Sequence, residues 1–292
     1  MTFPDIAPEI FSISIWGFEF ALRWYAVSYL AGFFAAYIVM REFVKREHLW
    51  PYSVRPMETS DVEAIIFYLI LGVVIGGRLG YVIFYNLEYY YSDPWSIPKL
   101  WDGGMSFHGG FLGVILALVF YCRRNGILLL CAADLIAISS GPGIFFGRVA
   151  NFINAELYGR PTDVPWGVVF PSTAAQNCPG VVGLCARHPS QLYEAGLEGA
   201  FMFILLVGVA FRGVLKRPGA VTSLFFIVYG VSRYVIEFYR VPDRQFFSPD
   251  NPYGFAYAIG DFGVTMGQAL CIPMILVGLI LILTRRKLDR GS

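Results

Sequence analysis

The stretch ISSGPGIFFGRVANFI (Ile138–Ile153) has the apolar character of a membrane-spanning helix, yet it contains Arg148. A second apolar stretch, AVTSLFFIVYGVSRYVIEF (Ala220–Phe238), contains Arg233. An arginine at the centre of a transmembrane helix is unfavourable by about 2.5–3.5 kcal/mol on insertion scales. Ionisable residues inside a membrane therefore indicate a functional site, and we expect these two arginines to hold an anionic group within the bilayer.

The composition of the chain is that of a membrane protein with several spans. Of its 292 residues, 57% are hydrophobic and 15% are charged, and its mean hydropathy is +0.59. An ordinary soluble domain has about 25% charged residues. The sequence predicts an all-α polytopic membrane protein, in a single domain over residues 1–292, with seven transmembrane helices that each cross a core of about 30 Å. We place these helices at about 19–40, 62–84, 105–122, 131–153, 193–211, 219–238 and 264–284.

The distribution of basic residues predicts the orientation of the spans. The loops after the first, third, fifth and seventh spans carry most of the Lys and Arg residues found in loops, such as Arg123, Arg124, Arg285 and Arg286. Short basic loops stay in the cytoplasm. We therefore expect the N-terminus outside, in the periplasm, and the C-terminus in the cytoplasm. Residues 1–18 lack the basic and apolar regions of a cleavable signal peptide.

The longest stretch between predicted spans covers residues 156–190. It is rich in proline and cannot form one helix, so we interpret it as a small periplasmic cap. Cys178 and Cys185 both lie in it, and an oxidising compartment would allow them to form a disulfide. A second irregular outer loop is expected over residues 241–262. The cysteines and the three histidines show no metal-ligand spacing, so we expect neither a metal site nor a cofactor.

The sixth predicted span carries a polar stripe. Tyr229, Arg233, Glu237 and Arg240 are spaced by four, four and three residues, which places them on one face of a helix. In one interpretation, Arg233 and Glu237 form an ion pair that only neutralises their two charges within the helical bundle. The other is an arginine that a carboxylate aligns for binding an anion. Four polar side chains on one stripe favour the second interpretation.

The fourth predicted span ends in a surface rich in hydrogen-bond donors. Arg148 is followed by Asn151 and Asn154, and Glu156 comes just after. Guanidinium and amide donors suit phosphate oxygens. Asparagine also forms hydrogen bonds between membrane helices, and these residues alone leave both interpretations open.

The segment WDGGMSFHGG (Trp101–Gly110) places His108 between two Gly-Gly pairs where the third span begins. Glycine lets a backbone approach a ligand closely, and the amino end of a helix favours anions. Histidine accepts protons near neutral pH, so His108 is a candidate general base. A capping role is the alternative. Arg78 is interpreted as structural. Tyr25 and RHPSQLYE (Arg187–Glu194) are interpreted as parts of a site at the same outer depth, and an anionic phospholipid would fit there.

In their order along the chain, five motifs closely resemble those of the bacterial prolipoprotein diacylglyceryl transferases: WDGGMSFHGG, GRVANFINAELYGR, RHPSQLYE, YGVSRYVIEFYR and MGQALCIP. The resemblance covers about Phe11–Arg286. It implies a seven-span protein of the bacterial inner membrane. Such a protein transfers the diacylglyceryl group of phosphatidylglycerol to the lipobox cysteine thiol of prolipoproteins, forming a thioether and releasing glycerol phosphate. The implied partners are phosphatidylglycerol, prolipoprotein signal peptides and the lipid bilayer, without nucleic acid.

The resemblance also implies roles for single residues. Catalytic roles fall on His108, Arg148 and Arg233, and His108 is either the general base or a ligand of the phosphate. Binding of phosphatidylglycerol falls on both arginines and on a further set: Tyr25, Asn151, Glu156, Gly159, Tyr229 and Glu237. Family members often have His at the position of Arg23 and Gly at the position of Ala155, so the role of Arg23 stays open.

Two other classes of protein compete with this reading. A secondary transporter for an anion would show matched halves with broken helices at the membrane midplane. An intramembrane serine protease would need a buried Ser–His pair, but Ser106, Ser139 and Ser140 lack a GxSG setting. The polar residues instead gather towards one face of the membrane, which favours the transferase.

Overall fold

The computed structural model describes residues 1–288 except 16–17, 179, 243–245, 247, 249–250, 252 and 260–261. Five of the helices described are long and apolar enough to cross a membrane. They are Trp24–Val44 (α1), Thr59–Tyr85 (α2), Leu129–Ile153 (α5), Ser190–Phe211 and most of Met266–Leu288 (α10). Large apolar side chains such as Phe34, Phe84 and Ile204 face outward from them. An apolar outer surface suits lipid, so the chain is a multi-pass helical membrane protein.

The remaining two predicted spans also correspond to helices. Phe107–Asn125 (α4) replaces the predicted 105–122, and Ala220–Ile236 (α9) replaces the predicted 219–238. Both are less suited to crossing a bilayer alone, because α4 ends in Arg123 and Arg124 and α9 has only 17 residues and includes Arg233. The fifth predicted span consists of three consecutive segments: Ser190–Glu194 (α7), the π-helix Ala195–Phe201 (η5) and Met202–Phe211 (α8).

Two small antiparallel hairpins depart from the all-helical prediction. Glu9–Ile15 (β1) pairs with Phe18–Arg23 (β2), and Tyr257–Ile259 (β3) pairs with Phe262–Val264 (β4). In β1, apolar residues alternate with serines, which is the period of a strand rather than of a helix. The first span consequently begins at Trp24 instead of residue 19. The predicted loop 241–262 lies partly outside the described residues.

The chain divides into two compact units, and their boundaries fall inside α1, inside α5 and on both sides of residues 215–218. One unit contains residues 1–36, 137–214 and 219–292, and the other contains residues 37–136 and 215–218. Short helical segments connect the longer helices. They are Glu47–Leu49 (η1), Pro51–Ser53 (η2), Leu87–Ser92 (α3), Pro94–Ser96 (η3), Leu100–Asp102 (η4), Thr173–Gln176 (α6) and Val214–Lys216 (η6).

In the unit that contains α2 and α4, glycines bring these two helices into backbone contact. A Cβ atom on Gly109 would lie 2.8 Å from the Cα atom of Gly80, and one on Gly72 would lie 2.6 Å from the carbonyl oxygen of Gly113. Small residues at helix interfaces allow such close packing in membranes. Gly109 belongs to the Gly-Gly pair after His108, so its missing side chain makes room for α2 rather than for a ligand.

Arg78 of α2 is almost fully buried in the same unit, and it holds the segment that leads to α4. Its guanidinium donates to the carbonyl oxygens of Ile97 at 2.7 Å, Ser96 at 2.8 Å and Lys99 at 2.9 Å, and also to those of Gly103 and Gly104. It also lies over the ring of Tyr90, 5.1 Å from its centroid. Carbonyl dipoles thus replace a counterion, and the geometry supports the structural interpretation of Arg78.

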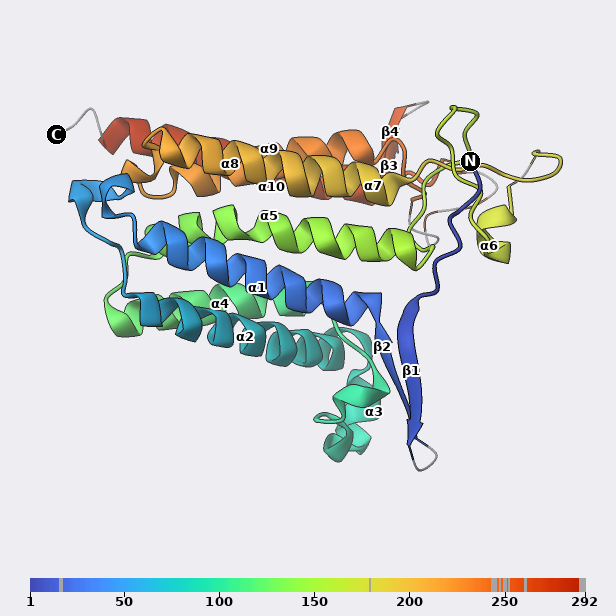
Figure 1. The fold of residues 1–292 in the computed structure, drawn as a ribbon, viewed down its shortest axis with the longest axis horizontal. Coiled ribbons are helices and arrows are strands. Elements are labelled where there is room, and N and C mark those ends of the chain that lie inside the picture. Colours follow the sequence, from blue (N-terminus) through green and yellow to red (C-terminus); the bar gives the residue numbers. More distant parts are fainter. Residues whose placement is uncertain are drawn as a thin grey trace. The chain divides into compact units, whose positions relative to one another are not determined.

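The other unit contains α7, η5, α8, α9, α10 and the second part of α5. The helices α8, α9 and α10 run side by side (Figure 1). Close contacts draw α5 and α10 against their neighbours. A Cβ atom on Gly199 would lie 2.8 Å from the Cα atom of Phe145 in α5, and one on Gly230 would lie 2.7 Å from Ile275 Cγ1 in α10.

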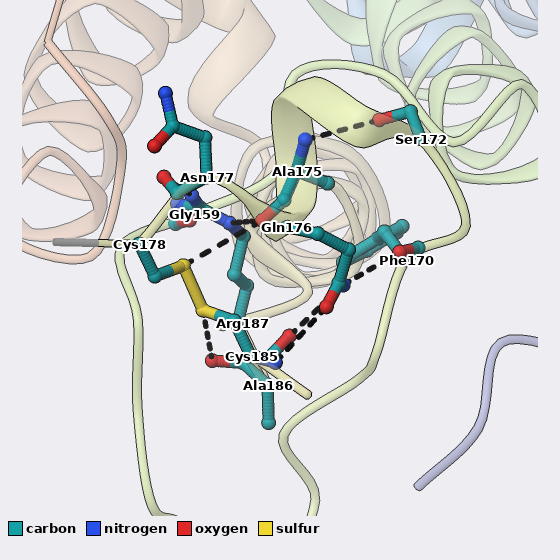
Figure 2. Close-up of a disulfide and its surroundings, with 10 residues drawn as sticks. All are labelled: Gly159, Phe170, Ser172, Ala175, Gln176, Asn177, Cys178, Cys185, Ala186 and Arg187. Atoms are coloured by element: carbon teal, nitrogen blue, oxygen red, sulfur yellow. Dashed lines mark hydrogen bonds between the residues drawn. A yellow bond between two sulfur atoms is a disulfide. The ribbon is translucent and has the colours of Figure 1, made fainter. Parts of the chain in front are cut away.

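The segment between α5 and α7 folds around a disulfide and a buried arginine (Figure 2). Cys178 and Cys185 are bonded, with their Cα atoms 6.3 Å apart, which confirms the pairing that the sequence allows. Arg187 donates to the carbonyl oxygens of Ala175 at 2.5 Å, Asn177 at 3.1 Å and Gly159 at 3.1 Å. The arginine therefore ties three separate parts of the segment together.

A small apolar core completes this segment. It consists of Val168, Phe170 and Ala175, and side chains including Phe3 and Ala155 pack against it. Ala155 has a φ of 52°, a left-handed conformation that favours glycine. This is the position at which the resemblance implies a common glycine, so the chain makes the same turn after α5 with a less suitable residue.

The α2–α4 contact generates a stability prediction. We expect Gly109→Ala to destabilise the protein by about 1–3 kcal/mol, because the added methyl group collides with backbone atoms of α2 that cannot give way cheaply. Thermal unfolding in detergent measures the effect. Gly208→Ala in α8 is the matched control, since a Cβ atom there meets nothing within 4 Å. Equal melting temperatures for the two variants would contradict the packing argument.

Candidate functional site

The polar stripe of α9 lies inside a network of buried charges. Arg233 Nη2 lies 3.0 Å from Glu237 Oε2, as the spacing in the sequence predicts. Its Nη1 atom lies 3.0 Å from Oε1 of Glu194, a residue of α7. Arg240 also contacts Glu194, and its Nε atom lies 3.6 Å from Glu237 Oε2. Arg233 therefore does more than pair with Glu237 within its own helix.

Arg148 joins the same network from α5. Its Nε atom lies 2.9 Å from Glu194 Oε2, and its Nη2 atom lies 3.7 Å from Glu198 Oε2. Arg233 Nη1 lies 3.9 Å from Glu198 Oε1. The structure thus brings together the two arginines that the sequence singles out. We call the whole group the arginine–carboxylate cluster: Arg148, Arg233, Arg240, Glu194, Glu198 and Glu237.

Burial makes this cluster electrostatically strong. The side chains of Glu194 and Glu198 are 0% exposed, while those of Arg148 and Arg233 are 22% and 17% exposed. Low dielectric surroundings strengthen attraction between opposite charges, but an unpaired charge there is very unfavourable. The side chains of Arg148 and Arg233 are therefore partly accessible, whereas the carboxylates of Glu194 and Glu198 are not.

The local backbone explains how the carboxylates reach the arginines. Glu194 ends α7 and Glu198 lies in η5, a π-helix of a type often found at functional sites. Gly199, next to Glu198, permits the backbone contact with Phe145 of α5 that brings the helix of Arg148 near. On the other side, a Cβ atom on Gly267 of α10 would lie 2.5 Å from the carboxyl carbon of Glu237. Both glycines therefore make space for the cluster.

A second polar group connects α1 with the end of α5. Asn151 Nδ2 donates to the hydroxyl of Tyr25 at 2.5 Å and to Glu156 Oε1 at 2.8 Å. Gln191 of α7 donates to the backbone oxygen of Glu156 at 2.5 Å. Three of the residues that the sequence predicts for lipid binding thus form one hydrogen-bonded group. Tyr229 lies apart from this group, with its ring stacked on Phe225 and within electrostatic range of Glu198 and Arg233.

Gly159 has a packing role that the structure makes plain. Its amide donates to the carbonyl oxygen of His188 at 2.8 Å, and an added Cβ atom would lie 2.8 Å from His188 Cβ. His188 Nδ1 lies 3.1 Å from the hydroxyl of Tyr193, and burial lowers the pKa of His188. The imidazole is therefore neutral at pH 7 in the folded protein.

His108 lies in the other unit from the arginine–carboxylate cluster. It occupies the first turn of α4, and its side chain is exposed. Ser106 caps this turn, because its hydroxyl accepts from the amide of Gly109 at 3.2 Å. The glycine-rich motif therefore builds a capped helix start, on which His108 is exposed and Gly109 packs against α2.

The sequence reasoning missed Glu198 and left Glu194 only as part of a polar segment. A signal was present, since LYEAGLE places two glutamates four residues apart in an apolar span. By the rule applied to arginine, a carboxylate in a span is also a functional candidate. Arg240 was recognised on the stripe of α9, but its contact with Glu194 was not foreseen.

The fold and the cluster define a multi-pass membrane protein with a buried, charge-compensated arginine site. The chain belongs to the prolipoprotein diacylglyceryl transferase family, whose sequence model matches residues 10–284. It is 53% identical over 287 residues to the phosphatidylglycerol–prolipoprotein diacylglyceryl transferase of Ruegeria pomeroyi, covering 98% of this chain and 97% of that protein.

Proteins of the same name from two other bacteria are also similar. The protein of Cereibacter sphaeroides is 52% identical over 286 residues, which is 98% of both chains. The protein of Rhizobium leguminosarum bv. trifolii is 43% identical over 288 residues, covering 98% of this chain and 94% of that one. The similarity thus extends over the whole chain.

The buried cluster generates a second prediction. We expect Glu194→Gln to destabilise the protein by about 3–5 kcal/mol, because it removes the one carboxylate that contacts all three arginines and leaves buried positive charge uncompensated. Thermal unfolding in detergent at constant pH gives the measurement. The control is Glu9→Gln, which removes an exposed ion pair with Arg23 and should change stability by less than about 1 kcal/mol. A similar loss in both variants would refute the buried-charge argument.

Proposed function

We propose that this protein transfers the diacylglyceryl group of phosphatidylglycerol to the lipobox cysteine thiol of a prolipoprotein, forming a thioether and releasing glycerol phosphate. Family membership supports the activity, and one observation supports its location. Arg148 and Arg233 approach a single anion, the Glu194 carboxylate, at 2.9 and 3.0 Å. Two guanidinium groups that converge on one carboxylate are also placed to bind a phosphate.

We further propose the membrane arrangement of this enzyme. It is an integral protein of the bacterial inner membrane with seven transmembrane helices, a periplasmic N-terminus and a cytoplasmic C-terminus. Both compact units act as one transferase domain, with residues 156–190 as a periplasmic cap. The basic loops support this orientation. The Cys178–Cys185 disulfide supports it too, since disulfides persist in oxidising compartments.

The bond changes of the reaction show where charge develops. The thiolate sulfur attacks the diacylglyceryl carbon, a carbon–sulfur bond forms, and the carbon–oxygen bond to the phosphate breaks. The leaving oxygen keeps the electron pair, so a phosphodiester with one negative charge becomes a monoester that approaches two. Groups that bind this growing charge more strongly in the transition state accelerate the reaction. Arg148 and Arg233 are the groups that we assign to this task.

The remaining predicted site residues receive supporting roles in the proposal. Asn151 adds hydrogen-bond donors for the phosphate, and Tyr25 and Glu156 orient its amide through the contacts described above. Glu237 aligns Arg233, and Tyr229 lies beside the same cluster. Gly159 contributes by its close packing against His188. The nucleophile comes from the substrate, so the enzyme itself needs no reactive Ser or Cys.

His108 is proposed as the general base. A free thiol has a pKa of about 8.5 and is only a few per cent ionised near neutral pH, so proton removal accelerates the attack. An exposed imidazole on the first turn of α4 suits this role. The same imidazole would bind phosphate if it were protonated, and turnover kinetics distinguish the two roles.

The experiment that tests the activity uses the purified protein, phosphatidylglycerol vesicles and a lipobox peptide, with mass spectrometry of the peptide cysteine. The wild-type protein should add the mass of one diacylglyceryl group. Arg148→Lys and Arg233→Lys should each lose about 10²–10³-fold in rate, because lysine keeps the charge but not the paired donors. Arg212→Lys, outside the cluster, should work normally. Normal rates in both cluster variants would exclude phosphate clamping, and an unmodified peptide with the wild-type protein would exclude the function.

The role of His108 is tested in the same assay. We expect His108→Gln to lower kcat by about 10²–10⁴-fold while the KM for phosphatidylglycerol stays near its wild-type value, since a base acts on the thiol and not on the lipid. His48→Gln is the control, because His48 is exposed in the loop after α1. A raised KM with little change in kcat would instead identify His108 as a phosphate ligand.

A further inference from the structure

Glu198 is the least satisfied member of the arginine–carboxylate cluster. Its side chain is fully buried, and neither carboxylate oxygen accepts a hydrogen bond from any described residue. Its nearest cations are Arg148 Nη2 at 3.7 Å and Arg233 Nη1 at 3.9 Å. A buried carboxylate without donors is unfavourable as an anion and much less so when protonated.

Glu194 and Glu237 are bound more closely. Glu194 lies 2.9 Å from Arg148 Nε and 3.0 Å from Arg233 Nη1, and Glu237 lies 3.0 Å from Arg233 Nη2. Glu194 Oε1 accepts hydrogen bonds from Arg233 and Arg240, whereas Glu194 Oε2 and Glu237 Oε2 are held by ion-pair contact without a hydrogen bond from the described residues. Of the three carboxylates, Glu198 therefore has the weakest contacts with the arginines, without a hydrogen bond and with ion-pair distances of 3.7 and 3.9 Å.

When all six groups of the arginine–carboxylate cluster are ionised, their charges cancel. Three arginines carry three positive charges, and three glutamates carry three negative ones. The titratable and charged groups around Glu198 come from the neighbouring helices and the segment after α9: Arg148 (α5), Glu194 (α7), Tyr229 and Arg233 (α9), Glu237 and Arg240 (after α9) and Cys271 (α10). An added phosphodiester would leave this buried region with one excess negative charge.

We propose that Glu198 takes up one proton when the phosphate of the lipid substrate binds at Arg148 and Arg233. This inference rests on the proposed function. The proton comes from solvent and forms an O–H bond on the carboxylate, and no other covalent bond changes in this step. The cluster then carries one positive charge, which matches the single negative charge of the phosphodiester. The proton returns to solvent when glycerol phosphate leaves.

Glu198 is thus a positioning residue that acts through the two arginines. As an anion it competes with the substrate phosphate for Arg148 Nη2 and Arg233 Nη1. Once neutral, it no longer attracts Arg148 Nη2, which becomes available to the lipid, and it no longer adds to the hold of Glu194 on Arg233 Nη1. The step also gives Glu198 a purpose, since Glu194 already forms ion pairs with both Arg148 and Arg233.

The test measures the KM for phosphatidylglycerol between pH 6.5 and 9, using the full chain and the lipobox peptide. In the wild-type protein KM should rise with pH, approaching roughly tenfold per pH unit, the slope for one coupled proton. Glu198→Gln keeps a neutral side chain of the same shape at every pH. Its KM should therefore be independent of pH and no higher than the lowest wild-type value. Changes in thiol ionisation appear in kcat, so the split between KM and kcat separates the two effects.

Two further measurements make the test decisive. Glu9→Gln, a neutralised carboxylate outside the cluster, should retain the wild-type slope. Calorimetry of wild-type protein with phosphatidylglycerol vesicles and no peptide, in two buffers of different ionisation enthalpy, should detect the uptake of about one proton near pH 8. This second measurement does not depend on the folding of any variant.

Failure of this inference is distinct from failure of the proposed function. An active wild-type protein that takes up no proton on lipid binding would overturn the role of Glu198, as would a Glu198→Gln variant with the wild-type pH slope. An unmodified peptide in the wild-type assay would instead reject the transferase activity, and the calorimetric result would still decide whether lipid binding and proton uptake are linked.

Discussion

Charge compensation within an apolar bundle is the constraint on which the rest of this structure depends. Arginines in membrane spans are tolerable only with partners nearby, and here the partners lie on different helices. Arg148 of α5 and Arg233 of α9 both require Glu194, so α7 has to lie between them. The small residues at the helix contacts follow from this requirement, because Gly199 and Gly267 leave room where a side chain would push the charged groups apart. Helix packing and site geometry are therefore set by the same few contacts.

The protein stabilises buried arginines in two different ways. Arg78 gives its donors to backbone carbonyl oxygens, which have no net charge and cannot exchange with an incoming anion. Arg148 and Arg233 are held by carboxylates, which carry the same charge as a phosphate and occupy the same donors. The first arrangement fixes a loop permanently, whereas the second keeps a positive site ready for another anion. The sequence already favours a structural role for Arg78, and the partners of each arginine give the physical reason for the difference.

Much of the fold follows from the sequence because span length and hydropathy are local properties. The helices fall near their predicted positions, and the spacing of Arg233 and Glu237 predicts their ion pair. Contacts between helices are not local, so the spacing of Glu194 and Glu198 could mark them as candidates but could not show that they contact Arg148. The π-helix that orients Glu198 also breaks the regular spacing on which such patterns depend. For Gly109 the sequence suggested a ligand site that the structure does not require. The glycine stands beside His108, but it is small because α2 packs against it. The β1–β2 hairpin was not predicted, because the apolar residues of β2 lead directly into those of α1.

The cluster also sets an order of events during synthesis. Arg148 leaves the ribosome before either of its carboxylate partners, since Glu194 and Glu198 follow it in the chain. Glu194 follows Arg148 by 46 residues, which take several seconds to make at about 5–20 residues per second. During this interval α5 holds a guanidinium without the carboxylates that pair with it in the folded protein, and the arrival of α7 and η5 removes the penalty. Stable insertion of α5 therefore depends on a later helix, which makes the helices that carry the cluster a unit of assembly as well as a unit of binding.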